Sequence, residues 1–234
     1  MNAISRTTGI PIGTVHRWLS GRPPAFEEPE GTTCTGCGHL EHTPERLDQS
    51  AYAYLLGLYL GDGHVASFPR TYCLRVYLDS RYPQIVRSCE DAVARVMAFN
   101  RVAAIPTNKG CTIVQCYSKQ WPCLLPQHGA GAKHERRIVL TDWQVAITSA
   151  HARELVRGLI HSDGSRSDNT VRTRERTYVY SRYLFSNRSE DIKAILCAHL
   201  DLLGIPWRRA GSADISVARR EAVARLDEFV GPKR

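Results

Sequence analysis

The stretch LLGLYLGDG at residues 55–63 decides the fold, because VRGLIHSDG at residues 156–164 has the same pattern. Both stretches run apolar, any, Gly, Leu, aromatic or Ile, any, small, Asp, Gly. A pattern that returns once at long spacing indicates an internal duplication rather than a local turn signal.

Two further matches follow these copies in the same order and at a nearly constant offset. VYLDSRYPQI (76–85) resembles YLFSNRSEDI (183–192), and HGAGAKHER (128–136) resembles FVGPKR (229–234). We therefore expect two similar halves that pack about a pseudo-twofold axis. Their boundaries are predicted at residues 49–150 and 151–234.

Composition narrows the functional classes. Apolar residues make up 43% of the 234 residues, which allows a sizeable core. The net charge of +8 favours a polyanionic partner such as nucleic acid, although a merely basic protein also fits. The longest apolar run, residues 51–60, is too short to span a bilayer, and no signal peptide is evident, so we expect a cytoplasmic location. The eight cysteines are scattered, which favours reduced thiols or metal ligands over disulfides.

Apolar periodicity predicts an alternation of helices and strands in each half. Helices are expected at the two acidic motifs and after each second match, and strands are expected between them. The expected helices are 51–60, 84–98, 153–162 and 189–203, and the expected strands after the amphipathic helices are 101–105, 111–118, 207–209 and 215–219.

The two motif helices carry features that cost stability. Gly57 inside a helix costs about 1 kcal/mol relative to Ala. Asp62 and Asp163 lie at the negative end of the helix dipole, where an anion is disfavoured by roughly 0.3–1 kcal/mol. Gly63 and Gly164 follow these aspartates, and we expect them to end the helices in the left-handed conformation.

Close packing of the two helices accounts for these costs. Small residues four apart, Gly57 with Gly61 and Gly158 with Ser162, allow helix backbones to approach each other. Asp62 and Asp163 then emerge side by side, and adjacent carboxylates are held together by hard divalent cations such as Mg²⁺. Such a centre cleaves phosphodiesters. The alternative is that each aspartate is only a turn residue at a helix end.

The paired motifs resemble those of the LAGLIDADG homing-endonuclease family, and the resemblance covers residues 49–234. It implies an α+β fold of two αββαββα halves whose sheets form a saddle over the DNA major groove. It also implies that Asp62 and Asp163 bind two or three Mg²⁺ ions at the interface of the motif helices. The sixth motif position, Asp in the family name, is Leu60 and His161 here.

The same resemblance implies roles for a few other side chains. The family's catalytic lysines match Lys133 and Lys233, and Ser80 and Asn187 fall near polar positions beside the metal site. The alternative for each lysine is a solvated side chain after a glycine-rich loop. The resemblance further implies cleavage across the minor groove that leaves short 3′ overhangs.

The segment 165–188 is basic and strand-like, and its alternation predicts one charged sheet face for DNA. Solvation of that face is the alternative. The first half offers a less basic counterpart that includes Arg70. The residues that we expect to contact DNA are Arg75, Arg81, Arg166, Arg172, Arg174, Arg176, Arg182, Arg188 and Asn187.

Residues 1–22 resemble a helix-turn-helix, with Thr14, His16 and Arg17 exposed on the helix that would enter the major groove. The first helix of a trihelical unit is missing before Met1, so the unit is truncated or starts upstream. A packing appendage of two short helices is the alternative.

Residues 23–48 are expected to be a linker in which the spacing of Cys34 and Cys37 fits a zinc knuckle, against the alternative of two thiols in a loop. The remaining zinc ligands would come from histidines and cysteines nearby or further along the chain, namely His39, His42, Cys111, Cys116, Cys123 and His128.

Together these features predict a monomeric, site-specific, Mg²⁺-dependent double-strand DNA endonuclease. The alternative is a non-cleaving, sequence-specific DNA-binding regulator with the same fold. An endonuclease embedded in an intein is a weaker option, because the chain has neither a splicing-type start nor a His-Asn end, and we expect a free-standing protein.

Overall fold

The computed structural model describes residues 34, 37, 46–172 and 175–231. Within the described part, residues from Arg46 onward belong to one compact unit that begins at His42, and both predicted halves lie in it. The helix-turn-helix-like segment therefore falls outside the described residues.

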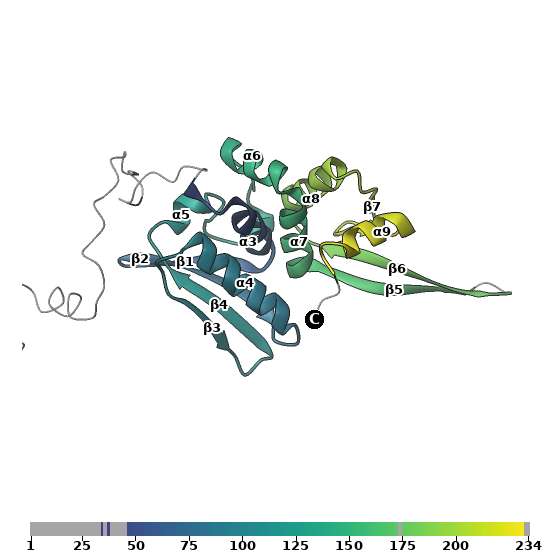
Figure 1. Cartoon of the computed structure of the whole chain (residues 1–234), viewed down its shortest axis with the longest axis horizontal. Coiled ribbons are helices and arrows are strands. Elements are labelled where there is room, and N and C mark those ends of the chain that lie inside the picture. Colours follow the sequence, from purple (N-terminus) through teal and green to yellow (C-terminus); the bar gives the residue numbers. More distant parts are fainter. Residues whose placement is uncertain (1–33, 35–36, 38–45, 173–174, 232–234) are drawn as a thin grey trace, which may run out of the picture. The chain divides into compact units, whose positions relative to one another are not determined.

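The first half runs helix, two strands, helix, two strands and a set of short helices (Figure 1). Its elements are α3 (Gln49–Asp62), β1 (Gly63–Phe68), β2 (Thr71–Asp79), α4 (Pro83–Val96), β3 (Val102–Pro106), β4 (Cys111–Tyr117), α5 (Trp121–Leu124), the 3-10 helix η2 (Lys133–Glu135) and α6 (Asp142–Ala150).

The second half repeats this order with a short final helix. Its elements are α7 (Ala152–Asp163), β5 (Gly164–Arg172), β6 (Thr177–Ser186), α8 (Glu190–Leu202), β7 (Arg208–Arg209), β8 (Asp214–Val217) and α9 (Arg220–Asp227). The α+β class and the expected αββαββα order are confirmed, with extra short helices after β4.

Each half contains one four-stranded antiparallel sheet, and the strand orders correspond. Sheet 1 has the order β1-β2-β4-β3 and sheet 2 the order β5-β6-β8-β7. Two sheets that share an order with a crossover are the structural counterpart of the sequence repeat. The β5–β6 pair extends well beyond β8, which pairs only with the last part of β6 (Figure 1).

The core lies between the helices and one face of each sheet. In sheet 1, Leu74, Val76 and Leu78 of β2 are buried on this side, and in sheet 2 Tyr183 and Phe185 of β6 are buried. Because side chains alternate along a strand, the residues between them lie on the opposite face, which we call the outer face of each sheet.

Helix α3 is the centre of the unit. Every residue from Ala51 to Leu60 is buried, so the helix has no polar stripe, as expected for a helix surrounded by other elements. Its start is fixed by Asp48, whose side chain accepts a hydrogen bond of 3.0 Å from the backbone N–H of Ala51. No described helix is long and apolar enough to cross a membrane.

Candidate functional site

Helices α3 and α7 pack with their backbones in contact at a pair of glycines. A Cβ atom added to Gly158 would lie 2.2 Å from the carbonyl oxygen of Tyr54, and one added to Gly57 would lie 2.5 Å from that of Leu155. Both distances are far below van der Waals contact with atoms that cannot move aside. These positions therefore require glycine, which accounts for the helix propensity lost there.

The contact continues to the ends of both helices. A Cβ on Gly61 would lie 2.2 Å from Oγ of Ser162 and 3.0 Å from Oδ2 of Asp163. The Ser162 hydroxyl donates to the carbonyl of Leu159 at 2.9 Å, so it turns back onto its own helix. The structure thus brings the α7 aspartate against the last turn of α3, where Asp62 is the final residue.

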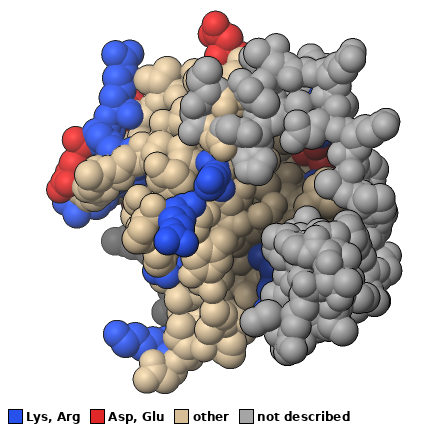
Figure 2. All heavy atoms as spheres, turned by 90° about the vertical axis from the view of Figure 1, so that its left-hand side faces the viewer, with Lys and Arg blue, Asp and Glu red and all other residues tan. Residues whose placement is uncertain are grey.

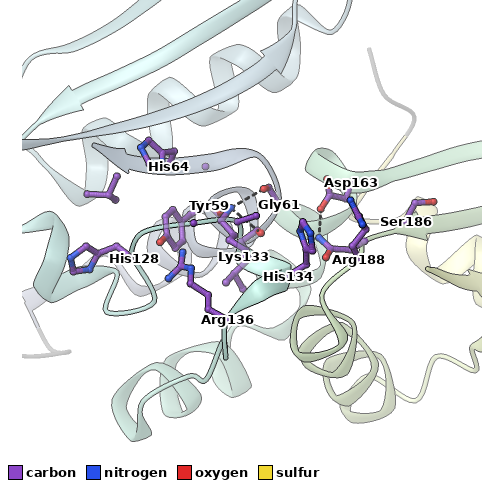
Figure 3. Close-up of a pocket in the computed structure, with 17 residues that line it drawn as sticks. Tyr59, Gly61, His64, His128, Lys133, His134, Arg136, Asp163, Ser186 and Arg188 are labelled. Carbon is purple, nitrogen blue, oxygen red and sulfur yellow. Dashed lines mark hydrogen bonds between the residues drawn. The ribbon is translucent and has the colours of Figure 1, made fainter. Parts of the chain in front are cut away.

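Asp163 is oriented by a side chain from the end of β6. The Nδ2 amide of Asn187 donates a hydrogen bond of 2.6 Å to Oδ2 of Asp163 (Figure 3). The corresponding end of β2 carries Ser80, whose hydroxyl shares a hydrogen bond of 2.8 Å with the hydroxyl of Thr112 instead. The two halves therefore support their aspartates differently.

Lys133 joins the loop after α5 to the end of α3. Its Nζ donates to the carbonyl oxygens of Leu60 at 3.0 Å and Gly61 at 2.8 Å, and also to that of Tyr59. The Tyr59 carbonyl also accepts from the backbone N–H of Gly63, whereas those of Leu60 and Gly61 belong to the last turn, where helical partners run out. The ammonium group also meets the negative end of the helix dipole. Lys133 is therefore a cap of α3 as well as a charge beside the aspartates.

Burial, with a smaller effect from Arg136, lowers the pKa of Lys133 to about 8, whereas Asp163 and Asp62 raise it. Both carboxylates thus act on one ammonium group, which places them in the same electrostatic environment. A lysine with a lowered pKa exchanges its proton near neutral pH, as in many reactive sites.

An open cavity of about 430 Å³ surrounds this arrangement (Figure 3). Gly61 and Gly63, the neighbours of Asp62, line it together with Lys133 and Asp163. Further lining residues, which sequence reasoning missed as a group, are mostly basic: His64, His128, His134 and Arg136 from the first half, and Ser186 and Arg188 from the second.

Three of these basic residues could have been predicted from the sequence. His128, His134 and Arg136 belong to the matched segment HGAGAKHER, of which the sequence predicts a catalytic role for Lys133 and only a candidate zinc-ligand role for His128. His64 directly follows the first motif, and its pKa is lowered by burial and by Lys133, Arg75 and Arg136. The cavity is therefore basic on the side of the first half.

The glycines that follow the aspartates correct one expectation. Gly63 has φ −88° and Gly164 φ −94°, so both are extended rather than left-handed. The chain passes directly from each helix into a strand, and a Cβ would lie 2.4 Å from Cα of Tyr59 or 2.6 Å from the carbonyl oxygen of Ile160. Glycine is needed there for space, not for its φ angle.

The expectation of one arginine-bearing face on the second sheet is also wrong. In the β5–β6 register Arg166 lies opposite Tyr183, on the helix-covered side, and forms an ion pair of 2.8 Å with Asp227 of α9. Arg182 lies opposite Ser167, on the outer face. Arg166 and Arg182 therefore lie on opposite faces of the sheet. The pairing register of β5 and β6 decides this, and the sequence of each strand does not reveal that register.

The remaining arginines have various surroundings. Arg81 forms an ion pair of 2.6 Å with Asp79, and Arg75 lies over the ring of Phe68 at 5.7 Å on the outer face of sheet 1. Arg176 and Arg188 are exposed.

Several predicted site residues fall outside the description. These are Thr14, His16, Arg17, Arg174 and Lys233, together with the side chain of Arg172. Cys34 and Cys37 are half-buried, and their zinc site stays a prediction.

The fold of the chain is similar to that of several solved structures. A crystal structure of I-DmoI in complex with DNA and Mn matches with a TM-score of 0.50 and 12% identity, covering 80% of this chain and 98% of that one. The chain has the LAGLIDADG homing-endonuclease fold. In this LAGLIDADG fold, α3 and α7 are the two motif helices.

Two other similar structures have lower scores. The LAGLIDADG meganuclease I-AabMI bound to uncleaved DNA matches at a TM-score of 0.48 and 10% identity, covering 76% of this chain and 82% of that one. The N-terminal LAGLIDADG domain of DUF199/WhiA matches at 0.47 and 13%, covering 80% and 83%. No protein-family model matches the chain, and no curated protein matches it.

Proposed function

We propose that this chain is a site-specific, metal-dependent endonuclease of double-stranded DNA. One observation carries the proposal: Asp163 and the two glycines that flank Asp62 line one basic cavity together with Lys133, on whose ammonium group both aspartates act. The similar structure of I-DmoI contains DNA and Mn, which supports the same partner and a divalent cation here.

The donor set fits a hard divalent cation such as Mg²⁺. Asp62 and Asp163 supply carboxylate oxygens, and no cysteine lines the described cavity. Asp62 and Asp163 are the residues that would hold such ions. When bound, the ions would supply an activated water and would stabilise the leaving oxygen of a phosphodiester.

The chain's own residues have separate tasks in this proposal. Asn187 fixes the orientation of the Asp163 carboxylate through its 2.6 Å hydrogen bond. Lys133 keeps a positive charge next to both carboxylates below about pH 8, and Arg136 and Arg188 add charge to the cavity wall. Together they favour a phosphate group at this point of the duplex.

We propose that the duplex lies across the outer faces of both sheets. Among the described elements the helices pack on the other face of each sheet, and the basic cavity opens between the start of β1, which bears His64, and the end of β6, which is followed by Asn187. Figure 2 shows Lys and Arg side chains in the middle and along the left and lower edges of one side of the unit. Thr14, His16 and Arg17 are proposed as a second DNA contact, Cys34 and Cys37 as zinc ligands, and the protein as a monomer.

The test uses Asp62→Asn and Asp163→Asn in the full-length chain. Each variant is incubated with a randomised duplex library and Mg²⁺, the ends produced are sequenced, and duplex binding is measured separately. We expect the wild type to cut at one motif and both variants to bind without cutting. Unchanged cutting by both variants would refute the assigned roles.

A non-cleaving DNA-binding protein is the second candidate, and one observation favours it. The Lys133 ammonium group already contacts three carbonyl oxygens at the end of α3, so its role can be wholly structural. In that case the wild-type chain selects one duplex motif and leaves it intact with every divalent cation tried.

A further inference from the structure

The outer face of sheet 1 is apolar where a DNA-contacting face is usually polar. The register aligns Tyr77 of β2, Ile113 of β4 and Ile105 of β3 in one row across the sheet. Tyr77 is 42% and Ile105 43% exposed, so the row faces solvent. Such a row offers methyl and ring surface but no backbone or charged donor.

The neighbouring residues extend this apolar surface. The rings of Phe68 and Tyr117 lie 5.6 Å apart, and Tyr117 is 43% exposed. The guanidinium group of Arg75 stacks on Phe68, which holds it close to the sheet. Gln115 of β4 lies opposite Arg75 in the register, so its side-chain amide is on the same outer face.

The outer face of sheet 2 is more polar next to the cavity. There it carries Ser165, Ser167 and Arg182, and Arg208 follows Ser216 across the sheet. The stacked rings of Tyr178 and Tyr180 lie on the same face nearer the end of the β5–β6 hairpin. Among the described atoms, Nε of Arg182 and Oγ of Ser216 are buried without a hydrogen-bond partner. Ser216 is only 1% exposed, so the donors that this face offers to a partner are those of the Arg182 and Arg208 guanidinium groups.

Base edges in the major groove differ in the same way. Thymine presents a methyl group that apolar side chains contact, adenine pairs with Gln, and guanine presents two acceptors to Arg. We infer that the two halves of the DNA site differ in composition: sheet 1 contacts a half rich in thymine and adenine, and sheet 2 a half that contains guanine. This inference rests on the proposed function.

Continuity with the cavity favours DNA over a protein as the partner of the apolar row. His64 lies opposite Arg75 in the β1–β2 register, on the same outer face, and it lines the cavity together with Asp163. A duplex whose phosphate enters the cavity therefore runs along this face. The net charge of +8 suits a polyanion, whereas it gives no attraction to a neutral apolar peptide.

The first test changes only the DNA. The full-length chain selects its site from randomised duplexes, and affinities are then measured for duplexes with uracil in place of thymine or 7-deazaguanine in place of guanine. Each uracil in the thymine-rich half should lower the affinity about fourfold, because one buried methyl group is lost. Each 7-deazaguanine in the other half should lower it about tenfold, because a charged hydrogen bond is lost.

The second test assigns each half to its sheet. Ile113→Gln should replace a preference for thymine by one for adenine at one position of the first half, and Arg182→Gln should weaken the guanine preference of the second half. Phe99→Gln is the matched control, because Phe99 is 94% exposed between α4 and β3 and belongs to neither sheet. Thermal unfolding verifies that each variant is folded.

The outcomes separate this inference from the proposed function. Absence of any sequence-selective duplex binding overturns the proposed function and this inference with it. Selective binding in which uracil has no effect, or in which Ile113→Gln leaves the selected site unchanged, overturns this inference alone and leaves the apolar row as a surface for another protein.

Discussion

Single side chains show how one residue serves the fold and the site together. Lys133 neutralises the end of α3 and carries charge beside Asp62 and Asp163, and Asn187 both ends the β6 strand and orients Asp163. The Asn187 side chain also accepts from the backbone N–H of Ser189 at 2.7 Å, which starts helix α8. A substitution at such a position alters local structure and chemistry at once, so its test needs two readouts.

Asn187→Ala removes the 2.6 Å hydrogen bond from the Asn187 amide to the Asp163 carboxylate. We expect cleavage to fall about 10- to 100-fold, which is the usual loss when a partner of a metal-ligating side chain is removed. Duplex affinity without divalent cations should stay within a few-fold of wild type. Ser186→Ala is the control, since the Ser186 hydroxyl donates to Asp214 and not to Asp163. Equal effects of the two variants on cleavage would contradict the assigned role.

Elements are held together here by close backbone contact and by ion pairs at their ends. The α3–α7 crossing depends on Gly57 and Gly158, which leave no room for a side chain. Helix α8 is fastened differently, because Glu190 in its first turn contacts Lys193 at 2.6 Å and Arg209 of β7 at 2.9 Å. The two devices predict different responses to mutation.

Gly158→Ala forces a methyl group to within 2.2 Å of a backbone oxygen, so α3 and α7 must separate. We expect the free energy of unfolding to fall by about 2–3 kcal/mol, as for other overpacked cores. Urea unfolding monitored by circular dichroism measures it. Gly129→Ala is the matched control, because its Cβ meets only the flexible end of Arg136, 2.8 Å away. A stable Gly158→Ala protein would show that the helices are not in backbone contact.

Glu190 makes stability depend on acid. Hydrogen bonds from Lys193 and Arg209 lower its pKa to about 2 from the ordinary 4.5. The folded chain thus releases this proton more readily than the unfolded chain, and the stabilisation, present above pH 4.5, is lost as pH falls towards 2. Glu190→Gln should be less stable than wild type at neutral pH, with the difference vanishing near pH 2.

Acid unfolding curves of the two proteins check this prediction. Glu221→Gln, which removes a carboxylate from the first turn of α9, is the control. A difference between Glu190→Gln and wild type that does not depend on pH would contradict the assigned ion pairs.

Helices were easier to predict from this sequence than strand faces. The motif helices and α4 and α8 were predicted within a few residues, because apolar spacing and the small residues depend on local periods alone. The single charged face of the second sheet was wrong, because it depends on which residue of β5 lies opposite Arg182. That register is set by the turn and by burial, and neither is visible in one strand's alternation.

The site shows the same division. The proximity of the two aspartates could be predicted, because the repeat and the spacing of small residues in the motif helices are visible in the sequence. The three histidines of the cavity were not predicted, because they come from a strand start and a long loop that only the folded chain brings together. Gly63 and Gly164 do end the motif helices, but the predicted left-handed conformation was wrong. Extended backbone and steric crowding, which explain these glycines, cannot be recognised in the sequence.

At the scale of the molecule, one topology is used twice with different surfaces. The sheets share a strand order, yet the outer face of sheet 1 carries an apolar row, whereas sheet 2 carries serines and Arg182 next to the cavity and has a longer strand pair. The basic loop that carries Lys133 and Arg136 belongs to the first half alone among the described residues. Duplication therefore supplies the pairing of the aspartates, and divergence supplies an asymmetric partner surface.

Binding of the whole chain to DNA should depend steeply on salt. The net charge of +8 spread over both halves implies several phosphate contacts, each releasing a counterion. With about six contacts, affinity falls roughly 10³-fold between 50 and 200 mM salt. Fluorescence anisotropy with a fixed duplex measures the slope, and Arg188→Gln, which removes a cavity charge, should make it shallower by about one contact. Since apolar contacts on sheet 1 release no ions, replacing Ile113 by Gln should leave the slope unchanged. Affinity that is insensitive to salt would show that the basic residues face away from the duplex.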